Sequence, residues 1–253
     1  YADLLENRYV NASMYPSTGL SLNIDRASYS NIRRFIRQQS PVPSDAVRIE
    51  EMLNYFNLAY QAPDSASVFQ LNSRLTDCPW NAQRRLLFVQ TNARQLNLDT
   101  LPPAHFTFLI DVSASMDTPN RLPLLQSAFR KLVDNLREKD SVAIVTYGGI
   151  TDIVLHTVSG KEKDTIRNVI DSLVAGGATP GESGVKLAYS VARRHFIPGG
   201  NNRVILATDG DFNVGLKTED ELEALITQES ERGIYLTCLG VGMGNYKDSK
   251  IQT

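Results

Sequence analysis

The chain contains 253 residues, of which 42% are hydrophobic and 21% are charged, and its formal net charge is −2 at pH 7. These proportions are typical of a globular protein, and the length accommodates one large domain and one smaller domain. No basic stripe indicates nucleic-acid binding, and no apolar run reaches the roughly 18 residues that a membrane span requires.

The first part of the chain, residues 1–102, has a mixed pattern that predicts a small α+β domain. Hydrophobic residues alternate in some segments, as in strands, and recur at helical spacing in others. In chain order we expect a short strand at residues 20–24, helices at residues 28–38 and 49–56, and strands at residues 68–75 and 85–91. Ser44 and Asp45 are expected to cap the second helix.

The second part, residues 103–253, alternates between strands and helices. We expect strands at residues 106–110, 142–147, 153–155, 204–207 and 234–239, and helices at residues 122–136, 166–173, 181–196 and 219–232. The third strand follows the second closely, which favours an antiparallel pair at the edge. The alternation predicts an α/β fold, a doubly wound and mostly parallel sheet with helices on both faces, as in Rossmann-like proteins. The chain stops soon after a strand, so we expect this domain to be incomplete at its C-terminal end.

Three polar segments of this second domain are expected at strand ends or before a helix. Asp111, Ser113 and Ser115 come directly after the first strand, and Asp209 follows the fourth. Thr179 lies in a glycine-flanked loop before a helix. Ligands of doubly wound sheets bind at the carboxyl ends of the strands, so we expect these five side chains to converge.

The chemistry of these side chains suits one small, hard cation. Mg²⁺ prefers oxygen ligands and usually takes only one or two carboxylates from a protein. The carboxylates of Asp111 and Asp209 balance its two charges, whereas the three hydroxyls add none. The ion therefore retains affinity for an outside carboxylate, and we predict a protein partner that supplies an acidic residue. Mn²⁺ and Ca²⁺ are the alternative ions.

The Asp111-x-Ser113-x-Ser115 string, together with Thr179 and Asp209, resembles a known ion-binding site. It is similar to the metal-ion-dependent adhesion site, or MIDAS, of von Willebrand factor type A domains. The resemblance extends over roughly residues 104–245. It implies that the first three residues hold the ion, that Asp209 binds it directly or through water, and that Thr179 joins when a ligand binds.

Further segments extend the resemblance to the bacterial YfbK-like family. They are residues 46–56, the turn at residues 78–81 and the string at residues 209–215. Many members of this family are envelope lipoproteins, which implies a location in the bacterial cell envelope, either periplasmic or lipid-anchored. The family also carries a further C-terminal domain, which we expect to be absent from this chain.

We therefore predict a metal-dependent, adhesion-type protein-binding module rather than an enzyme. A metal-dependent hydrolase is one alternative, but no histidine lies in sequence reach of Ser113 or Ser115. Ser113 also occupies the position where a phosphatase pattern has its second Asp. A structural interaction domain with an unoccupied metal site is the second alternative.

Two cysteines and one aspartate are expected to have structural roles. Cys78 and Cys238 are expected to be unpaired thiols, with a long-range disulfide as the alternative. They do not predict a zinc site, because no histidine pair lies near them. Asp117, followed by Thr118 and Pro119, is expected to cap the next helix.

Overall fold

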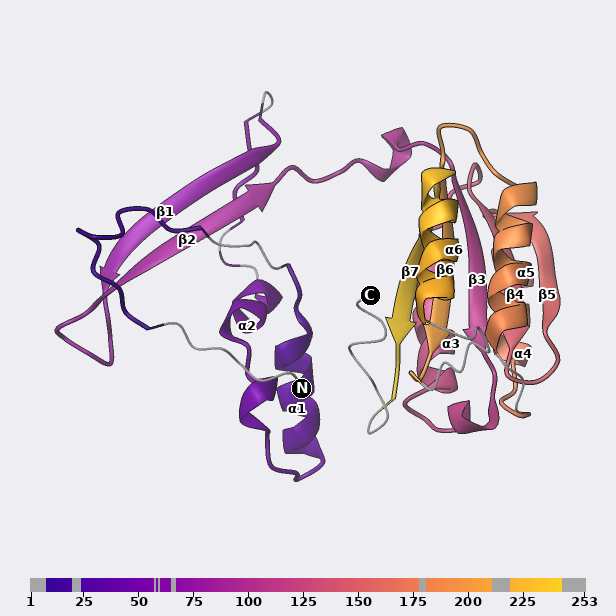
Figure 1. The fold of residues 1–253 in the computed structure, drawn as a ribbon, viewed down its shortest axis with the longest axis horizontal. Helices are drawn as coiled ribbons and strands as arrows, with labels where there is room; N and C mark the ends of the chain where they lie inside the picture. The colour runs from indigo at the N-terminus through magenta and orange to yellow at the C-terminus, as the bar shows by residue number, and fades with distance from the viewer. Residues whose placement is uncertain are drawn as a thin grey trace. The chain divides into compact units, whose positions relative to one another are not determined.

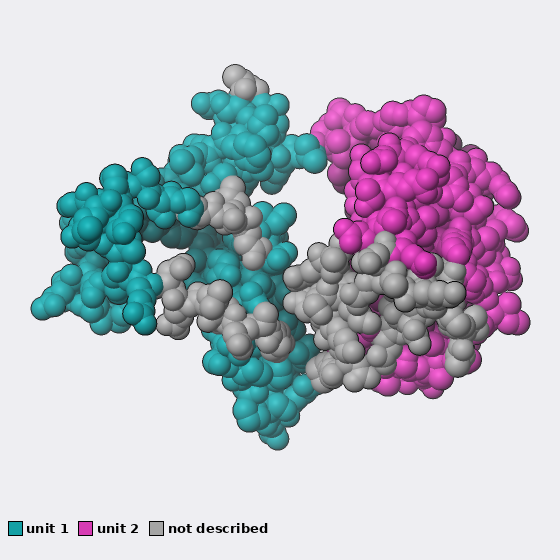
Figure 2. Space-filling model, in the orientation of Figure 1, with its two compact units in different colours: residues 1–96 teal, residues 97–253 magenta. Residues whose placement is uncertain are grey.

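The computed structural model describes residues 8–19, 24–56, 58, 60–64, 67–177, 181–210 and 219–242. Contacts divide the chain into two compact units, residues 1–96 (unit 1) and residues 97–253 (unit 2), as coloured in Figure 2. Three predicted features lie outside the described residues, namely residues 20–23, Thr179 and residues 211–215. The domain boundary expected after residue 102 stays a prediction.

Unit 1 combines two helices with one hairpin, which confirms the predicted α+β pattern. Helix α1 (Ala27–Arg37) packs against helix α2 (Ile49–Tyr55), and the ring centroids of Tyr29 and Phe56 lie 4.9 Å apart between them. The hairpin pairs two antiparallel strands, β1 (Phe69–Asp77) and β2 (Arg85–Ala93).

The beginning of α2 differs from the prediction. Ser44 and Asp45 do not cap this helix, since they belong to a separate 3₁₀ helix that ends at Ala46, and α2 begins only after Arg48. The cause is the buried hydroxyl of Ser28, which donates to the Ala46 carbonyl at 2.7 Å and accepts from the Arg48 N–H at 3.0 Å. These bonds hold the connecting segment against α1 and delay the start of α2.

Unit 2 is built on a five-stranded sheet with the strand order β5-β4-β3-β6-β7. The strands are β3 (Ala104–Asp111), β4 (Ser141–Tyr147), β5 (Asp152–Ser159), β6 (Asn201–Thr208) and β7 (Ile234–Gly240). β5 runs antiparallel to β4, whereas the other neighbouring pairs are parallel. The mixed parallel sheet confirms the predicted fold, including its antiparallel edge strand.

Helices cover both faces of this sheet, as Figure 1 shows. They are α3 (Leu122–Asp134) and α4 (Lys163–Ser172) on one face, and α5 (Gly181–Arg194) and α6 (Glu219–Glu231) on the other. Phe108 and Ile110 of β3 pack beneath α3 and α4, whereas Leu109 packs beneath α5. Burial on both faces explains why such a strand is mostly apolar in the sequence, although β3 also contains the buried polar residues His105 and Thr107.

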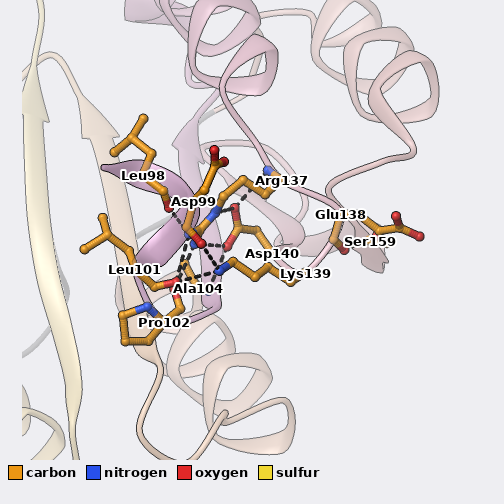
Figure 3. Close-up of polar contacts among 10 residues, drawn as sticks. All are labelled: Leu98, Asp99, Leu101, Pro102, Ala104, Arg137, Glu138, Lys139, Asp140 and Ser159. Carbon is orange, nitrogen blue, oxygen red and sulfur yellow. Dashed lines mark hydrogen bonds and ion pairs between the residues drawn. The ribbon is translucent and has the colours of Figure 1, made fainter. Parts of the chain in front are cut away.

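A polar clamp, formed by Arg137, Lys139 and Asp140, fixes the chain that enters β3 (Figure 3). The Arg137 guanidinium donates to three backbone carbonyls of residues 98–102, and the Lys139 ammonium donates to two. The Asp140 carboxylate accepts a hydrogen bond from the Ala104 N–H at 2.9 Å. The first residue of β3 is thereby tied to the turn that precedes β4.

Candidate metal centre

Two aspartates lie at the same edge of the sheet in unit 2. Asp111 ends β3, and Asp209 directly follows the neighbouring strand β6. These strands are parallel, with Ile110 paired to Ala207, so both carboxylates emerge at the carboxyl edge. Each is almost fully buried. The Thr208 hydroxyl donates to Asp111 Oδ2 at 3.3 Å and joins the two strand ends directly.

The electrostatics around Asp111 favour a cation. Burial raises the pKa of the Asp111 carboxyl above its usual value, and the charge of Asp209 raises it further, whereas hydrogen bonds from Ser113 and Tyr147 oppose the rise. The Ser113 bond runs from its backbone N–H to Asp111 Oδ1 at 2.8 Å. A bound cation relieves both the desolvation of the carboxylate and the repulsion from Asp209.

Ser113 and Ser115 present their hydroxyls on the same side of the loop after Asp111. The loop turns through a short 3₁₀ helix (Ala114–Met116), and the two hydroxyl oxygens lie 3.0 Å apart. Adjacent ligands of an octahedral Mg²⁺, each about 2.1 Å from the ion, lie about 3 Å from one another. The hydrogen bond between the two hydroxyls therefore keeps their oxygens about as close as two neighbouring ligands of a magnesium ion.

Backbone hydrogen bonds hold this loop against the loop that precedes α5. The Gly176 N–H donates to the Val112 carbonyl at 2.7 Å, and the Ala114 N–H donates to the Gly177 carbonyl at 3.1 Å. Gly177 has a φ of 89°, a conformation that strongly favours glycine. Thr179 follows shortly in the chain but lies outside the described residues, so its position in the site stays a prediction.

Gly148, in the loop after β4, leaves space for the segment that carries the predicted ligands. It has a φ of 103°. A Cβ atom at this position would lie 2.7 Å from Ser113 Cα and 2.9 Å from Asp111 Oδ1. The loop after β4 thus forms a wall of the site.

Arg121 is a residue of this site that the sequence did not indicate. One of its terminal nitrogens lies 2.7 Å from Asp209 Oδ2, and the same nitrogen donates to the Ser115 carbonyl at 2.5 Å. Its side chain is only 15% exposed. Since nothing in the spacing of residues links position 121 to position 209, only the folded structure shows this contact.

Asp117 does not cap the helix that follows, contrary to the prediction. It ends the 3₁₀ helix, while α3 begins at Leu122 and has a different proline, Pro123, in its first turn. The reason is an additional turn between the two helices, closed by a hydrogen bond from the Arg121 N–H to the Thr118 carbonyl at 3.0 Å.

The donor set of the site fits a hard divalent ion. It consists of two carboxylates and two serine hydroxyls, all of them oxygen ligands, which suit Mg²⁺ better than Zn²⁺. Within the described parts of the chain, no cluster of three or more His, Cys, Asp or Glu residues forms another candidate metal site. Cys78 and Cys238 are free thiols, as expected.

Comparison with known proteins supports the same family in both units. A family model described as von Willebrand factor type A domain matches residues 106–211, and one described as von Willebrand factor matches residues 1–88. The chain is 42% identical over 256 aligned residues to the uncharacterized protein YfbK of Escherichia coli (strain K12), covering 98% of this chain and 44% of YfbK. It is 27% identical over 175 residues to the uncharacterized protein sll0103 of Synechocystis, covering 68% of this chain and 40% of sll0103. The chain thus spans less than half the length of these two relatives.

A solved structure supports the fold. The von Willebrand factor type A protein from Catenulispora acidiphila matches with a TM-score of 0.50 and 20% sequence identity, over 78% of this chain and 44% of that chain. The matched family models and the identity to YfbK show that the chain belongs to the von Willebrand factor type A domain proteins, in the bacterial YfbK-like family.

Proposed function

We propose that this protein is a metal-dependent protein-binding module. Asp111, Ser113 and Ser115 hold a divalent ion, Asp209 binds it directly or through water, and Thr179 completes the shell when a partner binds. The observation that carries the proposal is the pair of buried carboxylates on adjacent strand ends, beside two hydroxyls that lie 3.0 Å apart.

The charge balance of the site indicates what the partner supplies. The two carboxylates neutralise a divalent ion, and the neutral hydroxyls leave its Lewis acidity available for one more oxygen ligand. A glutamate or aspartate of another protein is the ligand that this position favours. The role of the protein is to orient the fixed ligands and to leave one position open.

The small donor set favours Mg²⁺ among the candidate ions. Mg²⁺ usually takes only one or two carboxylates from a protein, whereas Ca²⁺ takes about six to eight oxygen ligands in a flexible geometry. Mn²⁺ is the alternative with similar chemistry, since its preferred ligands are also oxygens.

Binding is favoured over catalysis because the site lacks a suitable base among the described residues. His105 lies at the opposite end of β3, where its ring contacts Ser141 and Thr107. His195 lies beside it, with the ring centroids 5.7 Å apart. Neither imidazole is placed to activate a water molecule next to Asp111.

We also propose a location in the bacterial cell envelope, either periplasmic or lipid-anchored. This part of the proposal rests on the family resemblance and on the bacterial relatives. No helix within the described residues is long and apolar enough to cross a membrane.

The decisive experiment replaces Asp111 by Asn, which keeps the shape of the side chain but removes its charge. We expect calorimetry to show Mg²⁺ binding to the wild type and none to Asp111→Asn, and we expect partner capture from an envelope extract to fail in the variant. Asp117→Asn is the matched control, because Asp117 is an exposed aspartate close to the site. Equal Mg²⁺ binding by the wild type and Asp111→Asn would refute the proposal.

A further inference from the structure

We propose that Arg121 is an internal counter-ion of the metal centre, and that it competes with the divalent ion for Asp209. In the metal-free protein its guanidinium neutralises this buried carboxylate. When the ion binds, Arg121 leaves Asp209 and releases its other contacts. This inference rests on the proposed function, because it requires a divalent ion at this site.

The metal-free site holds two carboxylates that are almost fully removed from solvent. Asp209 is 1% exposed and lies close enough to Asp111 for its charge to raise the pKa of that carboxyl. Two buried carboxylates with no cation nearby are unfavourable. Arg121 supplies that cation, with a guanidinium nitrogen 2.7 Å from Asp209 Oδ2.

A bound divalent ion changes the charge balance of the site. The ion and Arg121 together carry three positive charges, whereas Asp111 and Asp209 carry two negative ones. The excess is unfavourable in a site that is largely removed from solvent, until a partner carboxylate arrives. Arg121 and the ion also approach the same carboxylate, so the ion binds Asp209 most strongly after the guanidinium has moved away.

Arg121 also contacts segments of the chain other than Asp209. The residue is the N-cap of α3, and it also donates to the Ser115 carbonyl in the loop of predicted ligands. Its side chain crosses the backbone of Gly242, beyond β7, where a Cβ atom would lie 2.7 Å from Arg121 Nε. Gly242 has a φ of 93°, so glycine is favoured there in any case. Displacement of one side chain therefore alters three segments together, namely the ligand loop, the start of α3 and the chain after β7.

The guanidinium geometry explains why arginine suits this role. A planar group with several N–H donors serves a carboxylate and a carbonyl from one rigid end, whereas a lysine ammonium is a single compact charge. Arg121→Lys is therefore expected to keep the charge but to hold the metal-free site less firmly.

The test measures Mg²⁺ affinity by calorimetry and the melting temperature in EDTA, on the full chain. For Arg121→Gln we expect Mg²⁺ to bind at least about tenfold more tightly than to the wild type, a size typical of coupled sites. We expect its melting temperature in EDTA to fall by several degrees, because a buried carboxylate loses its partner. The Mg²⁺ affinity of Arg121→Lys and its melting temperature in EDTA should lie between those of the wild type and Arg121→Gln.

Arg130→Gln is the matched control, since Arg130 belongs to the same helix but pairs with Asp171 at a half-exposed position. It should leave the Mg²⁺ affinity unchanged. If the wild type binds Mg²⁺ and Arg121→Gln binds it equally or more weakly, the competition is refuted while the proposed function stands. If neither protein binds Mg²⁺, both proposals are refuted.

Discussion

Asp140 and Arg137, in the turn between α3 and β4, form a two-pronged ion pair with nitrogen–oxygen distances of 2.6 and 2.8 Å. Burial by itself raises the pKa of Asp140, but hydrogen bonds from Arg137 and from the Ala104 N–H outweigh it and lower the pKa below its ordinary value. This carboxylate joins the beginning of β3 to the beginning of β4. Its charge therefore contributes to the stability of the sheet that carries the site.

Asp140→Asn is expected to lower the free energy of unfolding by about 3 kcal/mol at pH 7, because Arg137 loses a buried ionic partner. Since the pKa of Asp140 is lowered by folding, its contribution is complete above the ordinary pKa of about 3.9 and is lost as the pH falls below it. Urea denaturation at pH 7 and at pH 3 measures both effects. Asp171→Asn, which removes the half-exposed ion pair with Arg130, should lower the free energy of unfolding by less than about 1 kcal/mol. Equal losses of stability in the two variants would contradict the expectation.

The buried His105 leads us to expect that the free energy of unfolding also depends on pH in a second, higher range. It is fully buried, and burial together with the nearby His195 lowers its pKa to about 4. The unfolded chain takes up a proton at this position as the pH falls through about 6.5, whereas the folded chain does not until about pH 4. The free energy of unfolding should therefore decrease by about 3 kcal/mol as the pH falls across this window.

Denaturation midpoints between pH 7 and pH 4 provide the measurement. Substitution His105→Gln should weaken the dependence of the free energy of unfolding on pH in this range, whatever its effect on absolute stability. His156→Gln, at an exposed position of β5, is the control and should leave the slope as in the wild type. An NMR titration that placed the midpoint of His105 near 6.5 would show that this explanation is wrong.

Gly148→Ala tests how closely the loop after β4 approaches the predicted ligands. A methyl group there would collide with Ser113 and Asp111 as well as imposing an unfavourable φ of 103°. Gly199→Ala is the control, because Gly199 also has a positive φ of 69° but has nothing within 4 Å of the added atom. Gly199→Ala should cost about 1 kcal/mol of stability and keep Mg²⁺ affinity, whereas Gly148→Ala should cost more and abolish Mg²⁺ binding. Retention of Mg²⁺ binding in a folded Gly148→Ala protein would show that the loop adapts.

The elements of unit 2 are predictable from the sequence because their burial is periodic. Strands covered on both faces, such as β4 and β6, are mostly apolar, and the hydrophobic residues of the amphipathic helices recur at helical spacing. The antiparallel edge strand β5 was also predictable, because the connection from β4 is too short for a parallel crossover.

Features that depend on distant hydrogen bonds were not predictable in the same way. The expected caps at Ser44 and Asp117 were wrong, because bonds from Ser28 and an additional turn before α3 decide where those helices begin. Likewise, the boundary expected after residue 102 does not reveal that Arg137 binds the carbonyls of Leu101 and Pro102.

The candidate site shows the same division. Asp111 and Asp209 were expected at strand ends and expected to converge, by the general rule for parallel sheets, and the structure shows that their two strands are neighbours. Arg121 was missed because its contact with Asp209 depends on the path of the chain between β3 and α3. Whether the five predicted residues bind an ion stays a prediction.

The close backbone contacts of Gly148 and Gly177 limit how this centre can be transplanted. Grafting the Asp-x-Ser-x-Ser string onto another doubly wound scaffold would supply the right oxygens, but ordinary side chains in the neighbouring loops would push them out of position. A successful graft must transfer all three loops together. The glycines donate no ligand atom, yet replacing them would disturb the geometry of the site more than any other change in these loops.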